Sequence, residues 1–305
     1  MIAVIDCGTN TFNLLIGTVS GNEPEVVYHT KIPVRLGEGG IDRGILSKPA
    51  FERGINALVE FSKIIAEKKI EKILAIGTAA LRDAANGPEF IEACKQKTGI
   101  TIDLIEGERE AELIWKGARH CVNPKGKYLV MDIGGGSNEF IIADHHEIYW
   151  KKSYRLGLSR LKETFRFNDN PSEKEIHEVA VYLEKEMEDL FKVCKEYGIE
   201  TLVGTAGTFD TYASVFNFKY IGIDFDSSNK SMEFNNTELI DFCREFTTLS
   251  KNKRDAVEGI PEFRKEFMIY ATLLTQTVME KCNIKSSYLS TYALKEGVFI
   301  EALIK

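Results

Sequence analysis

The sequence predicts an α/β protein built from two duplicated domains with a cleft between them. Three observations support this fold class. The chain has 305 residues, which is long enough for two domain cores. Short segments recur in the same order in its two halves. Predicted strands also alternate with predicted helices, a pattern typical of a sheet covered by helices.

The first repeat pairs residues 2–8 with residues 128–134. In both segments an apolar strand runs into Asp-x-Gly, with the aspartates at Asp6 and Asp132. A small polar turn and a second apolar strand follow each motif, and the two aspartates are 126 residues apart.

Two further matches extend the repeat. Arg-Leu-Gly occurs at 35–37 and at 155–157, and Gly-Thr-Ala occurs within 76–80 and within 203–207. Their offsets are 120 and 127 residues. Three matches in one order at similar offsets are hard to obtain by chance, so we infer a duplication.

The turn-forming stretch Asn-Pro-Lys-Gly at 123–126 marks the seam between the halves. We therefore expect an N-terminal domain of residues 1–123 and a C-terminal domain of residues 124–305. The last helix is a candidate to pack back on the first domain. A hairpin turn from each half would then face the interdomain cleft.

The elements of the first half follow from its apolar pattern, which changes between helical spacing and short apolar runs. The predicted elements are strands 2–7, 12–19 and 25–36, helix 49–68, strand 72–76, helix 88–99, strand 100–105 and helix 108–119. The second half is expected to repeat this scheme, with a longer helical insertion at about 171–197 and a helical end at 237–283.

Composition narrows the classes of function. Neither a run near the roughly 20 apolar residues of a membrane helix nor a basic signal-peptide region is visible, so we expect a cytoplasmic protein without membrane contact. The six cysteines are too far apart along the chain for a zinc ribbon or a CxxC pair. The net charge of −7 argues against nucleic acid as a partner.

An anionic substrate would need a local positive field. The segment 151–155, with Arg160 and Lys162, is the candidate source of that field. A solvated basic face is the alternative interpretation of this cluster.

The turn after the second Asp-x-Gly start predicts a site for phosphate and metal. Gly134, Gly135 and Gly136 allow backbone N–H groups to approach an anion, and Ser137 adds a hydroxyl. A flexible hairpin tip would explain the glycines but not the acidic residues on either side, Asp132 and Glu139. Carboxylates beside a phosphate require a cation between them, and Mg²⁺ prefers such oxygen ligands.

The corresponding turn in the first half is polar. Thr9, Asn10 and Thr11 offer hydroxyl and amide donors for phosphate oxygens. Alone, this segment would be a plain Asx-type turn. Its relation to the glycine-rich turn by duplication favours phosphate binding.

The Gly-Thr repeats add further candidates for phosphate contacts. Arg82 follows the first repeat by about one turn and could hold phosphate through two parallel hydrogen bonds, although a surface helix charge is the alternative. Thr205, Gly207 and Thr208 form a small-residue turn that suits close approach of backbone to phosphate.

A general base is expected in the acidic run 106–112. Residues 110 and 114 share one helix face, and Ile114 is apolar, which places Glu110 toward the interior. In the first helical turn, the helix dipole should keep a carboxylate ionised. A solvated acidic face is the alternative.

These segments resemble the Ppx/GppA phosphatases, which comprise exopolyphosphatases and guanosine pentaphosphate phosphohydrolases of the actin-like superfamily. The resemblance covers most of the chain. It is carried by DCGTNTFNLLI, IGTAALRDAANG, EGEREAELIWKG, VMDIGGGSNEFII, YRLGLSRLKETF, VGTAGTFD and LSTYALKEGVF. It implies two actin-like, ribonuclease H-like domains with a phosphate pocket at their interface.

The resemblance also implies Mg²⁺-dependent attack of water on a terminal phosphorus. The position of the family's catalytic glutamate falls on Glu110, and that of its Ala-Leu-Arg arginine falls on Arg82. The acidic residues that flank the glycine loop fall on Asp132 and Glu139, and its serine falls on Ser137.

The chain departs from the family pattern at several places. Glu-Glu-Ala-Arg is replaced by Arg-Glu-Ala-Glu at 109–112, Asn138 stands for a threonine, and Lys295 stands for an arginine. A late segment with paired glycines is poorly matched at 264–272. These changes leave the catalytic loop intact but put the nucleoside- or chain-binding surface in doubt. Because the sequence ends at Lys305, we expect no C-terminal extension like that of longer members, which would favour short substrates.

We therefore predict a Mg²⁺-dependent phosphoanhydride hydrolase that releases terminal orthophosphate from short inorganic polyphosphate, with Mn²⁺ as the alternative ion. Guanosine pentaphosphate is the alternative substrate. A non-hydrolysing nucleotide sensor and a kinase of the same superfamily are the other hypotheses, although a kinase would need an aspartate base, for which only Asp6 is at hand. A homodimer is compatible with the resemblance.

Overall fold

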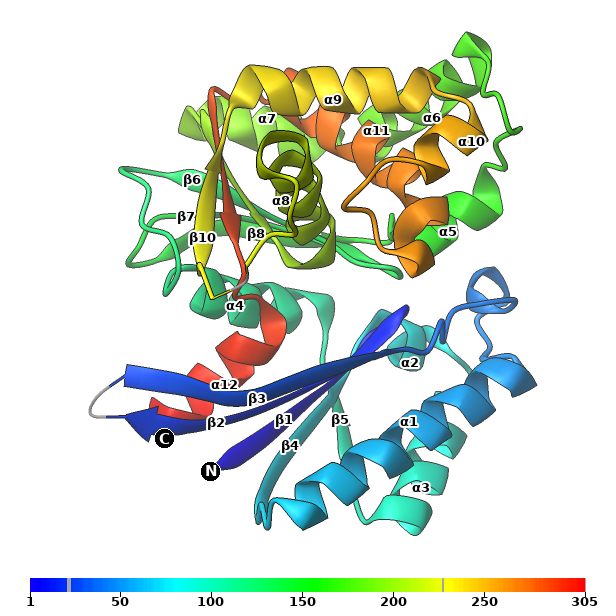
Figure 1. The fold of residues 1–305 in the computed structure, drawn as a ribbon, viewed down its shortest axis with the longest axis vertical. Coiled ribbons are helices and arrows are strands. Elements are labelled where there is room, and N and C mark those ends of the chain that lie inside the picture. Colours follow the sequence, from blue (N-terminus) through cyan, green and yellow to red (C-terminus); the bar gives the residue numbers. More distant parts are fainter. Residues whose placement is uncertain (21–22, 227, 305) are drawn as a thin grey trace.

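The computed structural model describes residues 1–20, 23–226 and 228–304. Two α/β halves are stacked along the long axis of the molecule, each with its own sheet and covering helices (Figure 1). The α/β fold class predicted from the sequence is confirmed. No helix in the described part of the chain is long and apolar enough to cross a membrane.

The first sheet has five strands in the order β3-β2-β1-β4-β5. Its central strand β1 pairs antiparallel with β2 and parallel with β4. The elements up to residue 118 are β1 (Ile2–Cys7), β2 (Thr11–Ser20), β3 (Glu23–Pro33), η1 (Ile41–Arg43), α1 (Lys48–Glu67), β4 (Lys72–Gly77), α2 (Ala79–Asp83), α3 (Gly87–Thr98), β5 (Ile102–Leu104) and α4 (Gly107–Ala118).

The second sheet has six strands in the order β10-β11-β9-β6-β7-β8. Strand β6 pairs antiparallel with β7 and parallel with β9, as β1 does with β2 and β4. The remaining elements are β6 (Tyr128–Ile133), β7 (Asn138–Ala143), β8 (Ile148–Tyr154), α5 (Leu158–Thr164), α6 (Glu173–Glu186), α7 (Glu188–Tyr197), β9 (Thr201–Thr205), α8 (Ala206–Ile221), β10 (Ser231–Phe234), α9 (Asn236–Thr248), α10 (Lys251–Asp255), η2 (Glu262–Arg264), α11 (Lys265–Lys281), β11 (Ser286–Ser290) and α12 (Leu294–Ile304).

The duplication is visible in strand register. In the first half Cys7 pairs with Phe12, and in the second half Ile133 pairs with Asn138. Each pair closes a hairpin turn of the same length. Strands β6 and β7 are buried along their whole length, as expected for apolar runs with helices on both faces.

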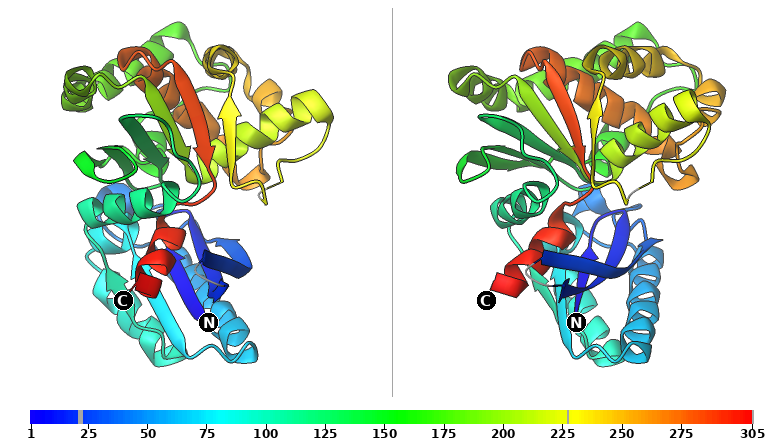
Figure 2. Two further views of the ribbon diagram at one scale, coloured as in Figure 1. Left: turned by 90° about the vertical axis from the view of Figure 1, so that its left-hand side faces the viewer. Right: turned by 60° about the vertical axis from the view of Figure 1, so that its left-hand side comes forward.

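The last helix leaves the second sheet and lies along the first one (Figure 2). Helix α12 contacts α4, β1 and β2. The Phe299 ring is buried against β2, where a Cβ at Gly17 would lie 2.3 Å from its Cζ atom. The apolar cluster around Phe299 contains Val4 of the first sheet and Val130 of the second, so a shared core layer joins the two halves. The boundary at residues 123 and 124 stays a prediction.

Two helical predictions differ from the structure, and one helix was missed. The insertion at 171–197 is two helices, α6 and α7, separated at the buried Met187. The helical end at 237–283 is interrupted between α10 and α11, where Gly259 has a φ of 86° and Pro261 follows. Helix α8 was not predicted, because the segment that opens it has the composition of a turn.

Candidate active site

Two turns face each other across the domain interface. In the second, the Gly134 amide donates to the Ser137 carbonyl oxygen at 3.1 Å, which closes the turn. The amides of Gly135 and Gly136 donate to no acceptor among the described residues. Both glycines line the cleft, so these N–H groups are available to an anion.

The first turn packs directly on the second. A Cβ at Gly135 would lie 2.7 Å from Asn10 Nδ2, and one at Gly136 would lie 2.6 Å from Thr9 Oγ1. The Ser159 hydroxyl donates to Asn10 Oδ1 at 2.8 Å and fixes that amide. The glycines are therefore needed for close contact between the halves as well as for anion binding.

The small-residue segment after β9 is the N-terminus of α8 rather than an open turn. Thr205 ends the strand, and its hydroxyl donates to Asp132 Oδ2 at 2.8 Å. Gly207 and Thr208, in the first helical turn, line the cleft. Because amides of a first helical turn lack intrahelical partners, this helix end can contact a phosphate.

The carboxylates around the cleft include the buried Glu110, Asp132 and Glu139 and the half-buried Asp6. Asp6 Oδ1 and Glu110 Oε2 have no hydrogen-bond partner. Burial raises the pKa of both Asp6 and Asp132 to about 6. Burial, followed by the charge of Asp132, raises the pKa of Glu139 to about 7. Such a cluster disfavours its own charge unless a cation is present.

The expectation that the helix dipole keeps Glu110 ionised is wrong for this arrangement. Glu110 lies in the first turn of α4, but burial and then the Glu139 carboxylate raise its pKa well above the usual range. Arg82 opposes this shift, with its Nη1 atom 3.6 Å from Glu110 Oε2. Desolvation therefore outweighs the dipole at this position.

The carboxylate cluster fits a Mg²⁺ ion. Magnesium is usually held by one or two carboxylates together with waters and substrate phosphates. No group of three or more His, Cys, Asp or Glu residues that could hold a metal ion occurs among the described residues, so waters and substrate phosphate would have to supply the other ligands. Asp132 lines the cleft and Glu139 pairs opposite it on β7, and the unpartnered Asp6 Oδ1 atom is a further oxygen in this region.

The structure brings together most of the predicted site residues. The cleft has a volume of about 210 Å³. Its lining includes Thr9, Asn10, Thr11, Glu110, Asp132, Gly134, Gly135, Gly136, Ser137, Gly207 and Thr208. The other three predicted residues, Arg82, Thr205 and Glu139, contact these residues from behind the cleft wall.

Several residues of the site were missed from the sequence. Lys31, Arg264 and Lys295 line the cleft and bring positive charge to it. Lys295 Nζ lies 2.9 Å from Glu296 Oε1, and its charge favours the ionised form of Asp6. The Arg264 guanidinium lies against α8, where a Cβ at Gly207 would be 1.8 Å from Nη2. The departures from the family pattern at 264–272 and at 295 were the only signals for these residues.

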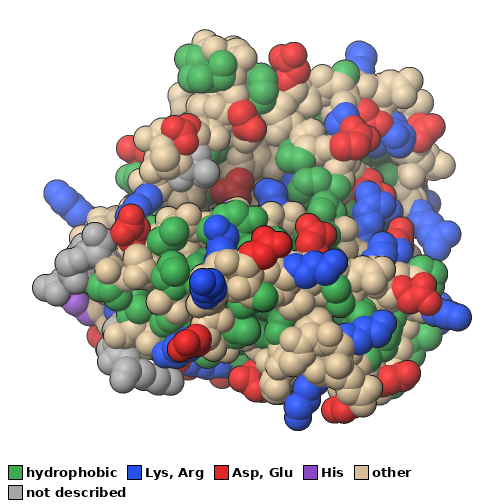
Figure 3. All heavy atoms as spheres, turned by 60° about the horizontal axis from the view of Figure 1, so that its bottom comes forward, with side chains coloured by type: hydrophobic (Ala, Val, Ile, Leu, Met, Phe, Trp, Pro, Cys, Tyr) green, Lys and Arg blue, Asp and Glu red, His purple; other side chains and the backbone are tan. Residues whose placement is uncertain are grey.

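The cluster predicted to supply a free positive field does not do so. Lys151 pairs with Glu112, Lys152 pairs with Asp189, and Lys162 pairs with Glu266. Arg155 and Arg160 both pair with Asp83 of α2. The basic side chains of this cluster thus form ion pairs between different helices and strands. Arg160 also links the two halves, through a hydrogen bond to the Ile41 carbonyl oxygen. On the face shown in Figure 3, charges of both signs are interspersed.

Comparison with known proteins places this site in context. The model of the Ppx/GppA phosphatase family matches residues 15–305. A Photobacterium profundum protein named guanosine-5'-triphosphate,3'-diphosphate pyrophosphatase is 29% identical over 319 residues, covering 100% of this chain and 60% of that protein. The chain thus spans about 60% of that relative's length.

Solved structures share the whole fold. The crystal structure of an exopolyphosphatase from Cytophaga hutchinsonii has a TM-score of 0.94 and 32% identity, covering 99% of this chain and 97% of that chain. A Ppx/GppA family member from Aquifex aeolicus has a TM-score of 0.82 and 25% identity, with coverage of 99% and 97%. The two-domain actin-like fold expected from the sequence is therefore confirmed.

Proposed function

The chain belongs to the Ppx/GppA phosphatase family, and we propose that it is a Mg²⁺-dependent hydrolase that releases terminal orthophosphate from inorganic polyphosphate. The observation that carries this proposal is the position of Glu110, a buried carboxylate whose Oε2 atom accepts no hydrogen bond, in a cleft lined by two phosphate-type turns.

The residues divide the work of phosphoryl transfer. The amides of Gly135 and Gly136 and the N-terminus of α8 would hold oxygens of the terminal phosphate. Asp132 and Glu139 would hold Mg²⁺ or Mn²⁺, which supplies positive charge against the phosphate oxygens. Positioning and electrostatics of this kind supply most of the acceleration in phosphoryl transfer.

Glu110 would orient the attacking water and accept its proton. A raised pKa suits this role, because a general base works best when its pKa lies near the operating pH. Arg82, next to the same carboxylate, would keep Glu110 in place and limit the rise of its pKa. The structure supports Arg82 in this supporting role more than in direct phosphate binding.

The test replaces Glu110 by glutamine. We expect Glu110→Gln to lower orthophosphate release from short polyphosphate by about 100- to 10,000-fold, with substrate binding retained. Glu112→Gln is the matched control on the same helix, because Glu112 pairs with Arg109 and Lys151 at a partly exposed position. It should keep near wild-type turnover. Normal turnover by Glu110→Gln would disprove the assignment.

Guanosine pentaphosphate is a second candidate substrate, favoured by the similarity to the Photobacterium profundum protein of that name. Parallel assays on short and long polyphosphate, guanosine pentaphosphate and ATP, with and without Mg²⁺, would rank the substrates. Phosphorylation of an added acceptor by ATP would point to a kinase. Tight binding of guanosine tetraphosphate without any phosphate release would point to a sensor.

A further inference from the structure

The glycine-rich turn is held from behind by the start of α5. A Cβ at Gly157, just before this helix, would lie 2.4 Å from the Gly135 carbonyl oxygen, so the two segments are in close contact. Three consecutive carbonyl oxygens of the turn accept hydrogen bonds from three consecutive residues of the helix. The pairs are Gly134 with the Leu158 amide, Gly135 with the Ser159 amide, and Gly136 with Arg160 Nε, each at 2.9 Å.

These hydrogen bonds set the direction of the amides on the other side of the turn. The described peptide bonds are trans, and in a trans peptide the C=O and the N–H of the next residue point in opposite directions. Because the three carbonyls face α5, the amides of Gly135, Gly136 and Ser137 point away from that helix. None of the three amides donates to an acceptor among the described residues, and all three residues line the cleft.

The third carbonyl of the turn has a different kind of donor. The Arg160 amide already donates to the Gly157 carbonyl oxygen within the helix, so the Gly136 carbonyl is bound by the Arg160 side chain instead. A charged donor on a carbonyl also polarises the peptide, which strengthens the N–H on its opposite side. The peptide between Gly136 and Ser137 is therefore oriented by a side chain that a substitution can remove without changing the helix backbone.

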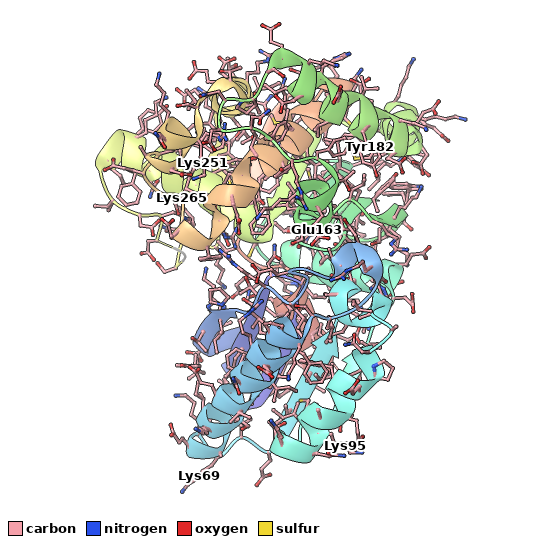
Figure 4. The ribbon with its side chains drawn as sticks, turned by 90° about the vertical axis from the view of Figure 1, so that its right-hand side faces the viewer. Lys69, Lys95, Glu163, Tyr182, Lys251 and Lys265 are labelled. Carbon is pink, nitrogen blue, oxygen red and sulfur yellow. The ribbon has the colours of Figure 1, made fainter. Side chains whose placement is uncertain are left out.

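The other nitrogens of the Arg160 guanidinium are held by the first half of the chain. Its Nη2 atom donates to Asp83 Oδ2 of α2 at 2.6 Å, and its Nη1 atom donates to the Ile41 carbonyl oxygen at 3.4 Å. Arg160 is buried, so the carboxylate is needed to balance its charge. Helix α5 lies at the level where the two domains meet, as Glu163 on its next turn shows (Figure 4).

Asp83 also adjoins the residues that surround the proposed base. Its Oδ1 atom lies 3.6 Å from Arg82 Nε, and Arg82 Nη1 lies 3.6 Å from Glu110 Oε2. Arg160 thus shares a carboxylate with the arginine beside the base. Through Asp83 it connects a phosphate-facing peptide of the second half with the hydrolytic residues of the first half.

We propose that Arg160 is a positioning residue for the hydrolysis. It orients the peptide between Gly136 and Ser137 so that the Ser137 amide faces the terminal phosphate, and Asp83 holds Arg160 in that position. This inference rests on the proposed function for the presence of a phosphate at the turn. It goes beyond that function by giving a role to a residue that is not part of the cleft lining.

The test changes Arg160 and leaves the backbone of α5 in place. Arg160→Lys keeps a cation near Asp83 but offers one nitrogen in place of the planar guanidinium. We expect Arg160→Lys to lower kcat for short polyphosphate about 10-fold and Arg160→Ala about 100-fold, because a donor to the transferred phosphoryl group loses its orientation. KM should change less than about 3-fold, because the other phosphate contacts are kept.

Arg155→Ala is the matched control. Arg155 pairs with the same Asp83 Oδ2 atom at 3.2 Å, but its side chain is 71% exposed, and it makes no hydrogen bond to the turn among the described residues. Its removal should change kcat less than about 2-fold. Millimolar guanidinium chloride should restore part of the kcat of Arg160→Ala and leave that of Arg155→Ala unchanged. Melting temperatures of the same variants show whether any loss of activity follows loss of folding.

The outcomes separate this inference from the proposed function. A wild-type kcat in Arg160→Lys, or a loss that only follows a lower melting temperature, would overturn the positioning role. Failure of the wild-type protein to release phosphate from any substrate would overturn the proposed function instead. The turn would still be tested in that case by inorganic phosphate binding, measured by calorimetry. Arg160→Lys should bind phosphate about 10-fold more weakly than wild type, and equal binding, or none to either protein, would overturn the inference.

Discussion

The two strand–turn–strand units have the same register but carry different residues opposite the aspartate. Asp6 pairs across the hairpin with Asn13, whose amide donates to Asp6 Oδ2 at 3.0 Å. Asp132 pairs at the same register with Glu139. One unit therefore joins a carboxylate to a neutral donor, and the other places two carboxylates side by side.

The backbone hydrogen bonds that support the two turns are also similar. In the first half the Gly37 amide donates to the Thr9 carbonyl oxygen, and in the second the Ser159 amide donates to that of Gly135. Gly37 ends the first Arg-Leu-Gly segment, and Ser159 lies two residues after the second. The backbone support of each turn is thus similar, and the second carboxylate, Glu139, is the reason why we propose the cation site at the second turn.

The largest expected effect comes from removing that difference. Glu139→Gln makes the second unit neutral opposite its aspartate, as the first unit is. We expect it to lower phosphate release by about 100-fold or more and to raise the Mg²⁺ concentration for half-maximal activity, because a metal-binding carboxylate is lost. A Mg²⁺ titration of initial rates measures both values.

Asn13→Ala is the matched change in the first unit. It removes a donor to Asp6 but no carboxylate, so its Mg²⁺ requirement should stay near the wild-type value. If Asn13→Ala shifted the requirement as much as Glu139→Gln, the cation site could not be assigned to the second unit.

A smaller effect is expected where the two turns touch. Gly135→Ala would place a Cβ 2.7 Å from Asn10 Nδ2, so we expect it to lower the free energy of unfolding by about 1–3 kcal/mol. Asn10→Gly in the same chain removes the clashing side chain and should restore much of that loss. Urea unfolding of the single and double variants measures the coupling between them.

Additive effects of these two changes would show that the turns do not contact each other in solution. Gly8→Ala is the control in the first turn. There, a Cβ would approach the Thr11 carbonyl oxygen of its own hairpin at 2.9 Å rather than the opposite domain. Asn10→Gly should therefore leave its effect unchanged.

Local patterns in the sequence were enough to predict the repeat and the burial of Glu110. The apolar Ile114, one turn along α4, indicated which carboxylate of the acidic run faces inward, and both residues line the cleft. The paired Asp-x-Gly motifs likewise predicted equivalent hairpins. Each motif is local in sequence, and the repeat follows from comparing such motifs between the two halves.

What the sequence could not supply were contacts between distant segments. Ser153, on the next strand, donates to Glu139 at 2.7 Å, and Lys295 reaches the cleft from the first turn of α12. The pKa of Glu110 depends on burial and on Glu139, neither of which can be read from its own helix. Helix α8 was missed because Gly-Thr-Ala-Gly-Thr has the composition of a turn, while tertiary packing decides its conformation.

The smallest effect concerns stability and pH in protein freed of metal by a chelator. The pKa of Asp6 and that of Asp132 rise to about 6, and that of Glu139 rises to about 7, all above their usual values. The folded state therefore binds more protons than the unfolded state between about pH 4 and pH 7. At low pH these carboxyl groups are protonated, and the fold is more stable than it would be with the groups ionised. That contribution to stability is lost as pH rises.

The comparison between the units sharpens this expectation. Glu139→Gln removes the group with the higher of these pKa values, so its melting temperature should approach the wild-type value near pH 5 and exceed it by a few degrees above about pH 7. Mg²⁺ should stabilise the wild-type protein most in the same high-pH range, because it replaces the missing protons as the counter-charge. If the wild-type protein gained stability relative to Glu139→Gln as pH rises, that result would contradict the raised pKa of Glu139. Melting curves at several pH values, with and without Mg²⁺, therefore test whether two carboxylates opposite each other distinguish the second turn from the first.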